Sequence, residues 1–292
     1  TRRYMPMFHK SRFWFIALIY HLHVQSVKAF LSVNVKPFSK AKTQVSVINN
    51  ARIEAISSTS DIYDAAKFMI DAFWLHSPQG LLLDDTVVMS DIDKDALIKH
   101  QFADFQEKYG ERMGQRVLRT SLLRAVDSTT NVCLGLVGLE VSLLNTDIGD
   151  TISTTKSEDM IKRAVTSLGP KQRRQFKNAS VDDIARELLS PEWKAVAILS
   201  NLVVSPLARR RGLAKALCDH VECIASGPEW RYSELYLRVE IENLAARELY
   251  QNKLGFQQAY ELSGVSGMRV HGGKFSVIPV DTLVLSKRLS ND

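Results

Sequence analysis

The chain has 292 residues, of which 45% are hydrophobic and 24% are charged; this composition is typical of a globular domain and excludes a fibrous or low-complexity chain. Its net charge is +6, but residues 1–50 hold eight of the 38 Lys and Arg residues and no Asp or Glu. Residues 51–292 therefore carry 30 basic and 32 acidic residues, which gives no indication of nucleic-acid binding. Three cysteines, Cys133, Cys218 and Cys223, are too few for a disulfide framework, and we expect no bound metal.

Residues 1–50 are predicted to be a targeting leader in two parts. A basic stretch at 1–12 precedes an apolar run at 13–24 that is too short to span a membrane comfortably, and the small residue Ala29 follows at a position suited to cleavage. This order is that of a signal peptide. The residues that follow it lack acids and are rich in Lys and Ser, as transit peptides are.

The junction between the two parts gives the expected location. Ala29–Phe30 resembles the cleavage junction of the two-part plastid leaders of diatoms and related algae, although Val27-Lys28-Ala29 stands where those leaders usually have Ala-Ser-Ala. We therefore expect a plastid protein, with the secretory pathway as the alternative, and a mature form that does not bind membranes.

Residues 51–292 are expected to form one mixed α/β domain. Its first part is predicted to contain a strand at 52–56, a capped helix at 58–74, a long loop at 75–93, a helix at 94–110, and strands at 119–127 and 131–144. The polar stretch 145–193 has helical patterns at 157–168 and 180–189, but too few apolar residues for a core of its own. We interpret it as an insertion between two strands.

The second part of the domain is predicted to be a strand–helix–strand unit followed by a helix and a final strand. The unit spans a strand at 195–205, a helix at 209–226 and a strand at 233–241. A helix at 243–256 follows, with Asn243 as its N-terminal cap and Gly255 as its C-terminal cap, and a strand at 281–289 ends the domain.

The stretch "ARRRGLAKAL" at 208–217 lies where a predicted strand leads into a helix. The first turn of a helix has unpaired amide hydrogens and the positive end of the helix dipole, so phosphate oxygens bind there readily. Gly212 lets the backbone approach an anion, and the preceding arginines attract one. Taken alone, the pattern also fits a solvated helix start. It is not a P-loop or a dinucleotide fingerprint, because the required Gly-Lys-Ser/Thr or spaced glycines are absent.

Two motifs in this region resemble those of the GCN5-related N-acetyltransferase (GNAT) superfamily. Arg209-x-x-Gly212-x-Ala214 is similar to its pyrophosphate-binding turn, and a second signature is matched by Asn243, Ala246, Leu249-Tyr250 and Gly255-Phe256. The likeness covers about residues 195–260 and, more loosely, 51–145 and the final strand. It implies a GNAT fold: an α/β mixed central sheet that is splayed at the acetyl-CoA site, flanked by helices, with a helical insertion between two central strands.

The resemblance implies that acetyl-CoA is the co-substrate. The strand before the turn would carry a bulge and pair its backbone with the pantetheine arm, and an exposed N–H near Leu202 would polarise the thioester carbonyl. The residues implied to contact acetyl-CoA are Leu202, Val203, Val204, Arg209, Arg210, Arg211, Gly212, Leu213, Ala214, Asn243, Ala246 and Tyr250.

Two residues are predicted to transfer protons. The Tyr250 hydroxyl would protonate the departing thiolate, and Glu140, on a strand expected to face the cleft, would accept the proton of the amine. The alternative to Glu140 is an ordered water held by Ser200 or Asn201. His220 is expected to be a surface residue.

We therefore expect an N-acetyltransferase that acetylates protein N-terminal α-amines, lysine ε-amines or both by direct attack in a ternary complex. The alternatives are a small-amine acetyltransferase and a non-catalytic acyl-CoA-binding module. Loops at 75–93 and 263–273 are expected to select the acceptor, because loops carry specificity on a rigid scaffold. The insertion at 145–193 is expected to cover the site, bind a partner or be merely solvated, and the sequence does not indicate the oligomeric state. Similarity to the plastid protein acetyltransferases of plants and algae rests on the leader and this insertion.

Overall fold

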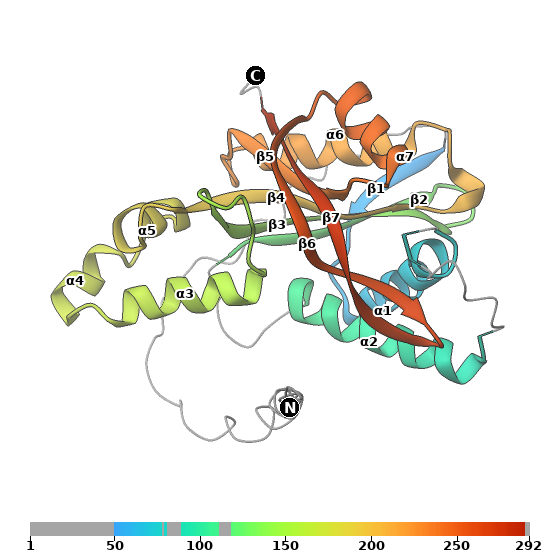
Figure 1. Ribbon diagram of the computed structural model, residues 1–292, viewed down its shortest axis with the longest axis horizontal. Coiled ribbons are helices and arrows are strands. Elements are labelled where there is room, and N and C mark those ends of the chain that lie inside the picture. The colour runs from blue at the N-terminus through green and yellow to red at the C-terminus, as the bar shows by residue number, and fades with distance from the viewer. Residues whose placement is uncertain (1–49, 78, 81–88, 111–117, 290–292) are drawn as a thin grey trace, which may run out of the picture. The chain divides into compact units, whose positions relative to one another are not determined.

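The computed structural model of the chain describes residues 50–77, 79–80, 89–110 and 118–289 (Figure 1). The predicted leader lies outside the described residues, apart from Asn50. Part of the expected loop at 75–93 lies outside them as well. Within the described part, no helix combines the length and the apolar character that crossing a bilayer requires.

Seven strands of the described chain form one sheet in the order β1-β2-β3-β4-β5-β7-β6. Neighbouring strands are antiparallel except β4 and β5, which are parallel, so the sheet is mixed. The strands are β1 (Ala51–Ala55), β2 (Thr120–Asp127), β3 (Cys133–Asn145), β4 (Trp193–Val204), β5 (Glu234–Glu240), β6 (Gln257–His271) and β7 (Lys274–Arg288).

Helices lie on both faces of this sheet and at one of its edges (Figure 1). They are α1 (Thr59–Met69), α2 (Asp91–Tyr109), α3 (Thr154–Thr166), α4 (Pro170–Gln175), α5 (Val181–Leu188), α6 (Leu213–Ser226) and α7 (Leu244–Arg247). Two π-helical turns, η2 (Ile70–Trp74) and η4 (Glu248–Lys253), continue α1 and α7, and a short 3-10 turn, η3 (Pro206–Ala208), precedes α6.

The core is divided by the sheet into two layers. On one face, α6 packs its buried side chains, among them Leu217 and Val221, against Leu139 and Leu199 of the central strands. On the other face, α1, η2 and α2 pack against Leu136 and its neighbours. Because side chains alternate along a strand, the continuously buried run of β3 contributes side chains to both layers.

The insertion between β3 and β4 covers a sheet edge. Thr120, the first residue of β2, pairs with Glu140 of β3. β3 continues past this pair, so its next backbone groups need other partners. The amide of Leu143 donates to Ser157 Oγ at 2.9 Å, and its carbonyl accepts from Ile152 at 3.1 Å. Ile161 and Ile184 pack on the end of the same strand. The expected insertion between two central strands is confirmed, because its helices share the core of the sheet instead of building a separate one.

The predicted strands and helices before β6 are present, with shifted ends. α2 begins at Asp91, where Ser90 caps it by accepting from the Asp93 amide, three residues before the expected start. α6 begins at Leu213 rather than at 209, because the arginines form a turn before it. The expected helix at 243–256 is a short α-helix continued by a π-helical turn. α4 was not predicted.

One prediction is wrong. Residues 263–273 were expected to be a loop, but 263–271 belong to β6, which pairs with β7 in a long hairpin that turns at Gly272 and Gly273. The glycines and serines of this stretch weaken its strand pattern, and two register shifts interrupt its alternation. Pairing with the full length of β7 decides its conformation. β7 likewise begins at Lys274, well before the predicted 281–289 strand.

Candidate active site

The sheet opens between β4 and β5. These parallel strands are paired only at Ala197–Leu235 and Ile198–Tyr236. From Leu199 to Val204, β4 has its β3 neighbour on one side and no paired strand on the other. We call this gap the β4–β5 opening. It confirms the predicted splay of the sheet.

A bulge lies in β4 beside this opening. Val203 pairs with Leu136 and Ser200 pairs with Gly138, so three steps along β4 correspond to two along β3. Asn201 takes up the extra residue in a left-handed conformation with φ of 52°. Asn tolerates that conformation better than most residues. The bulge implied by the resemblance is therefore present, and it displaces the backbone of Asn201 and Leu202 from the regular ladder.

The arginine–glycine turn follows β4 directly. Arg210 and Gly212 both adopt left-handed conformations, with φ of 64° and 81°. The first amide of α6 with a backbone acceptor is that of Ala216, which donates to Gly212 O at 3.0 Å. The amides of Leu213 and Ala214 have no backbone acceptor among the described residues. A side-chain carbon built on Gly212 would meet nothing within 4 Å, so the turn is open to an anion.

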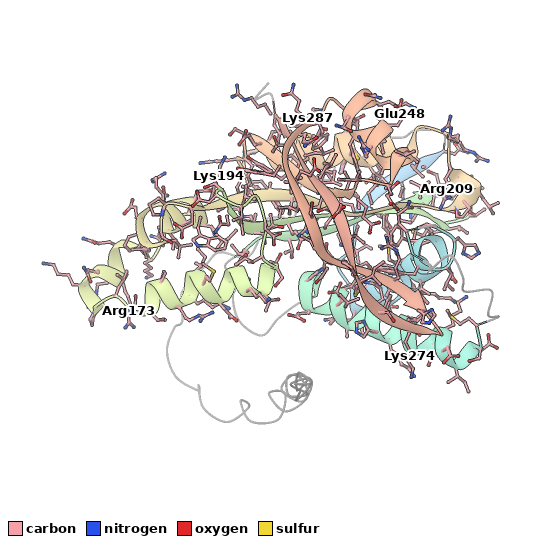
Figure 2. The ribbon with its side chains drawn as sticks, viewed as in Figure 1. Arg173, Lys194, Arg209, Glu248, Lys274 and Lys287 are labelled. Atoms are coloured by element: carbon pink, nitrogen blue, oxygen red, sulfur yellow. The ribbon has the colours of Figure 1, made fainter. Side chains whose placement is uncertain are left out.

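The three arginines of the turn are exposed, but they are not equivalent. Arg209 donates from Nε to Val204 O at 3.2 Å and from Nη2 to Ala72 O at 3.3 Å. It therefore ties the end of β4 to η2. Figure 2 shows Arg209 at the end of the sheet where β4 leads into α6. Arg210 and Arg211 are exposed side chains of the same turn.

The second motif spans α7, the π-helical turn η4 and the residues that end it. Asn243 caps α7, since its Oδ1 accepts from the Ala246 amide at 3.1 Å, as predicted. Gly255 follows the π-helical turn with φ of 77°, which is the left-handed residue that ends a helix. Both cap assignments are confirmed. Ala246 is half-buried against the α6 layer of the core.

Tyr250 lies in the π-helical turn and is 7% exposed. Its ring meets Phe256 edge-on at a centroid distance of 5.9 Å, and its hydroxyl has no hydrogen bond to another described residue. Burial, and then the nearby Cys218 thiol, raise the pKa of Tyr250 above its ordinary value. The phenol therefore keeps its proton at neutral pH, as an acid must.

The strand residues implied to bind the coenzyme have different side-chain environments. Val203 is buried in the α1–α2 layer, whereas Leu202 and Val204 are half-buried against the α6 layer. Their side chains therefore belong to the core, and only their backbone N–H and C=O groups are available to the opening. His220 is half-buried on α6, and burial lowers its pKa.

Glu140 lies on the opposite face of the sheet from α6 and is 8% exposed. Its Oε2 accepts a hydrogen bond from Thr154 Oγ1 at 2.6 Å. Burial of the nearby Lys108 lowers the pKa of its amine. The Asp104 and Glu140 carboxylates outweigh this effect, so the Lys108 pKa is raised overall. Glu140 is thus on the α2 side of β3, and Tyr250 is on the α6 side of the sheet.

A cluster that the sequence did not reveal lies at the bulge itself. The Tyr109 hydroxyl, from the last residue of α2, lies 3.1 Å from Ser200 Oγ and accepts from Asn201 Nδ2 at 2.8 Å. Burial of this hydroxyl, followed by the nearby Glu140 carboxylate, raises the Tyr109 pKa well above its usual range. A tyrosine at the end of a predicted helix is ordinarily interpreted as a packing residue, so the sequence contains no signal that marks Tyr109 as part of the site.

The two segments expected to select the acceptor are brought together, although one is a hairpin. The Val270 amide donates to Gly80 O at 2.7 Å. Phe275 packs on Trp74 and His100, each at a centroid distance of 5.0 Å. The hairpin tip, marked by Lys274 in Figure 2, thereby lies against α2 and η2.

Neither metals nor disulfides enter this arrangement within the described residues. No group of three or more His, Cys, Asp or Glu side chains there could hold a metal ion. All three cysteines are free; Cys218 is buried and Cys223, on the other side of α6, is exposed.

One family model and several solved structures are similar to parts of this chain. Residues 185–256 match the family model described as the acetyltransferase (GNAT) family. No curated protein matches the chain. Similar solved structures include NAA60 of Arabidopsis thaliana in complex with a bisubstrate analogue, at 17% identity and a TM-score of 0.45 over 82% of this chain and 99% of that one.

Two bacterial structures are similar to a like degree. An N-acetyltransferase from Staphylococcus aureus Mu50 has 15% identity and a TM-score of 0.44, over 83% of this chain and 100% of that one. The ribosomal-protein-S18-alanine N-acetyltransferase from Escherichia coli has 14% identity and a TM-score of 0.42, over 82% and 94%. The matched segment, 185–256, contains the β4 bulge, the arginine–glycine turn and Tyr250.

Proposed function

We propose that this chain is an acetyl-CoA-dependent N-acetyltransferase that acetylates protein N-terminal α-amines, lysine ε-amines or both, by direct attack of the amine in a ternary complex. The observation that carries the proposal is the β4–β5 opening. The β4 edge, which has no partner strand there among the described residues, runs directly into the turn before α6, where the amides of Leu213 and Ala214 have no backbone acceptor among those residues. Acetyl-CoA, when bound, supplies an acetyl thioester at one end and a diphosphate at the other.

The residues of the turn suit a diphosphate. The amides of Leu213 and Ala214 have no backbone acceptor in the part of the chain that the structure describes, and Gly212 leaves open space where a side chain would stand. Such amides, together with the dipole of a 14-residue helix, bind phosphate oxygens. Arg210 and Arg211 add exposed positive charge beside them.

The unpaired edge of β4 suits the amide-bearing arm of the coenzyme. An extended chain with its own N–H and C=O groups adds to a free strand edge by main-chain hydrogen bonds. The bulge turns the backbone near Leu202 out of the regular ladder. An amide hydrogen held there would stabilise negative charge on the thioester oxygen during attack.

Tyr250 is proposed to protonate the leaving sulfur. Its buried phenol holds a proton at neutral pH, and its hydroxyl is not engaged by other described side chains. Asn243, whose Oδ1 caps α7, keeps its side-chain NH2 for the coenzyme.

The amine must lose a proton, and we assign that role to Glu140. Its carboxylate is buried on the α2 side of the sheet, where Thr154 orients it by a hydrogen bond. The competing route is a water held at the bulge by Ser200 or Asn201. The acceptor would reach this side past the 75–80 segment and the β6–β7 hairpin tip.

The test is mass spectrometry of a peptide library incubated with the protein and acetyl-CoA. Acetylated N-termini or lysines are the expected result, and their ratio identifies the acceptor class. Acetylation confined to small amines such as polyamines would select the metabolite enzyme. Bound acetyl-CoA with no acetylated acceptor would select the non-catalytic binding module, and no binding of acetyl-CoA would refute the proposal.

We also propose that residues 1–50 direct the protein to the plastid, on the grounds of their two-part composition and the Ala29–Phe30 junction. Fusion of this segment to a fluorescent protein in a diatom tests it. Fluorescence within the plastid is expected, and Phe30→Ala should leave the fusion outside the plastid. Secretion of the unmodified fusion would contradict the proposal.

A further inference from the structure

We propose that Tyr109 is a positioning residue of the acetyl-transfer site: its hydroxyl holds the β4 bulge in place and so fixes the Leu202 backbone beside the β4–β5 opening. This inference rests on the proposed function, because it concerns the geometry of the same site. Tyr109 comes from α2, 92 residues away from Asn201 in the sequence, and lies outside the segment that matches the GNAT family.

The hydroxyl of Tyr109 is bonded to the two residues where the bulge begins. Asn201 Nδ2 donates to it at 2.8 Å, and Ser200 Oγ lies 3.1 Å away. Asn201 Nδ2 also lies 3.3 Å from Ser200 Oγ, so the three side chains form a closed triangle. Asn201 is the left-handed residue of the bulge. Its side chain is therefore held from α2 while its backbone turns away from the ladder.

Gly138 makes room for this contact. It lies on β3 directly opposite Ser200. A side-chain carbon built on Gly138 would lie 2.3 Å from the Tyr109 hydroxyl and 2.7 Å from Ser200 Oγ, both closer than atoms can approach. The hydroxyl thus occupies the space that any other residue at this position would fill, and a small residue on β3 is a condition of the triangle.

The chemistry of the group fits a fixed contact rather than proton transfer. Burial of the hydroxyl raises the pKa of Tyr109, so it remains a neutral phenol that can accept from Asn201 and share a hydrogen with Ser200. Around it lie Phe105, which meets its ring edge-on at 5.7 Å, and the carboxylate of Glu140. The packing against Phe105 restricts the ring, and a restricted ring can hold a strained backbone in one geometry.

The experiment compares Tyr109→Phe with the parent in steady-state kinetics, in acetyl-CoA binding by calorimetry, and in the crystal. We expect kcat to fall about tenfold because the reacting groups are misplaced, with the acetyl-CoA Kd and the acceptor KM changed less than about twofold. The crystal structure should show Asn201 out of the left-handed conformation. Tyr236→Phe is the matched control, since it removes a hydroxyl on β5 that donates to Glu234 at 3.1 Å.

Gly138→Ala is the second variant, and it tests the same contact without altering the tyrosine. It should lower kcat by a similar factor, and the double variant should lower it no further, because both changes act on one hydroxyl. A Tyr109→Phe protein with parental kcat, or with Asn201 unmoved, would overturn the proposal. A raised acceptor KM with parental kcat would also overturn it, since Tyr109 would then contact the acceptor.

The experiment also distinguishes failure of the proposed function from failure of the Tyr109 proposal. A parent protein that acetylates nothing refutes the enzyme assignment, while the conformation of Asn201 in the variant crystals still decides whether Tyr109 holds the bulge.

Discussion

Two regions of the domain are built in contrasting ways. The region proposed to bind the coenzyme, residues 193–253, which we call the coenzyme region, is one continuous segment whose bulge, turn and π-helical turn follow each other along the chain. The helix–hairpin region, consisting of α1, η2, α2, β6 and β7, is assembled from both ends of the domain; Trp74 and Phe275 touch across it. A site made of backbone amides depends on the local chain conformation, so it needs particular residues at fixed spacing in the sequence. A site made of side chains needs only that the fold brings those side chains close together.

The contrast predicts where function and stability can be changed separately. Substitutions in the coenzyme region should alter acetyl-CoA binding or chemistry. Those in the helix–hairpin region should alter acceptor handling or stability, except at Tyr109, whose hydroxyl contacts the β4 bulge. The five predictions below test this, from the largest expected effect to the smallest.

Tyr250→Phe should lower kcat about 10³-fold, because the leaving sulfur loses its acid. Stability should be unchanged or slightly higher, since the removed hydroxyl has no hydrogen bond to other described residues. Kinetics and thermal unfolding measure the two effects. A variant that acetylates peptides as fast as the parent would move the acid to another group.

Glu140→Gln should lower kcat about 10²-fold, and the effect should shrink as pH rises and more of the free amine is present. The amide can still accept from Thr154, so folding should be preserved. Glu222→Gln, which alters an ion pair with Lys287 at the far end of α6, is the control. An unchanged kcat for Glu140→Gln would assign the proton to a water at the bulge.

Gly212→Val should weaken acetyl-CoA binding about thirtyfold, because a β-branched residue resists the left-handed conformation that the turn requires. The acceptor KM should be unchanged. Gly272→Val imposes the same conformational cost at the hairpin tip, where φ is 53°, and serves as the control for calorimetry. Equal losses of acetyl-CoA affinity in both variants would contradict the division into two regions.

Arg269→Gln should lower the free energy of unfolding by about 2 kcal/mol, since it leaves the partner carboxylate without its cation. In the structure, Arg269 bonds both oxygens of Glu240 at 2.8 and 2.6 Å and is 8% exposed. Arg238→Gln breaks a more exposed pair with Asp150 and should cost less than about 1 kcal/mol. Urea unfolding measures both. Acetyl-CoA affinity that falls with Arg269→Gln would show that the regions are coupled.

The smallest effect is on the pH dependence of stability. Folding raises the pKa of Tyr109 and Tyr250, so the folded protein keeps phenol protons that the unfolded chain releases above about pH 10. The free energy of unfolding should therefore fall as pH rises beyond that point, by at most about 1.4 kcal/mol per pH unit for each group. Tyr250→Phe should flatten the decline measured by urea unfolding; an equally steep decline would contradict burial of that hydroxyl.

The coenzyme region was largely readable from the sequence. The arginine–glycine turn, the Asn243 and Gly255 caps and the burial of the insertion against existing strands follow from local rules: which residues adopt positive φ, which side chains cap a helix, and how many apolar residues a core needs. The splay and the bulge came from the resemblance, and local patterns do not show them.

What only the tertiary structure decided lies where strands and helices far apart in the chain meet. The hairpin formed by 263–271 depends on pairing with β7, and the triangle of Tyr109, Ser200 and Asn201 depends on α2 ending over Gly138. The local conformational preference of a residue is determined by the few residues on either side of it in the chain. Contacts such as these depend on the packing of the whole sheet, so they exist only once the fold has brought them together.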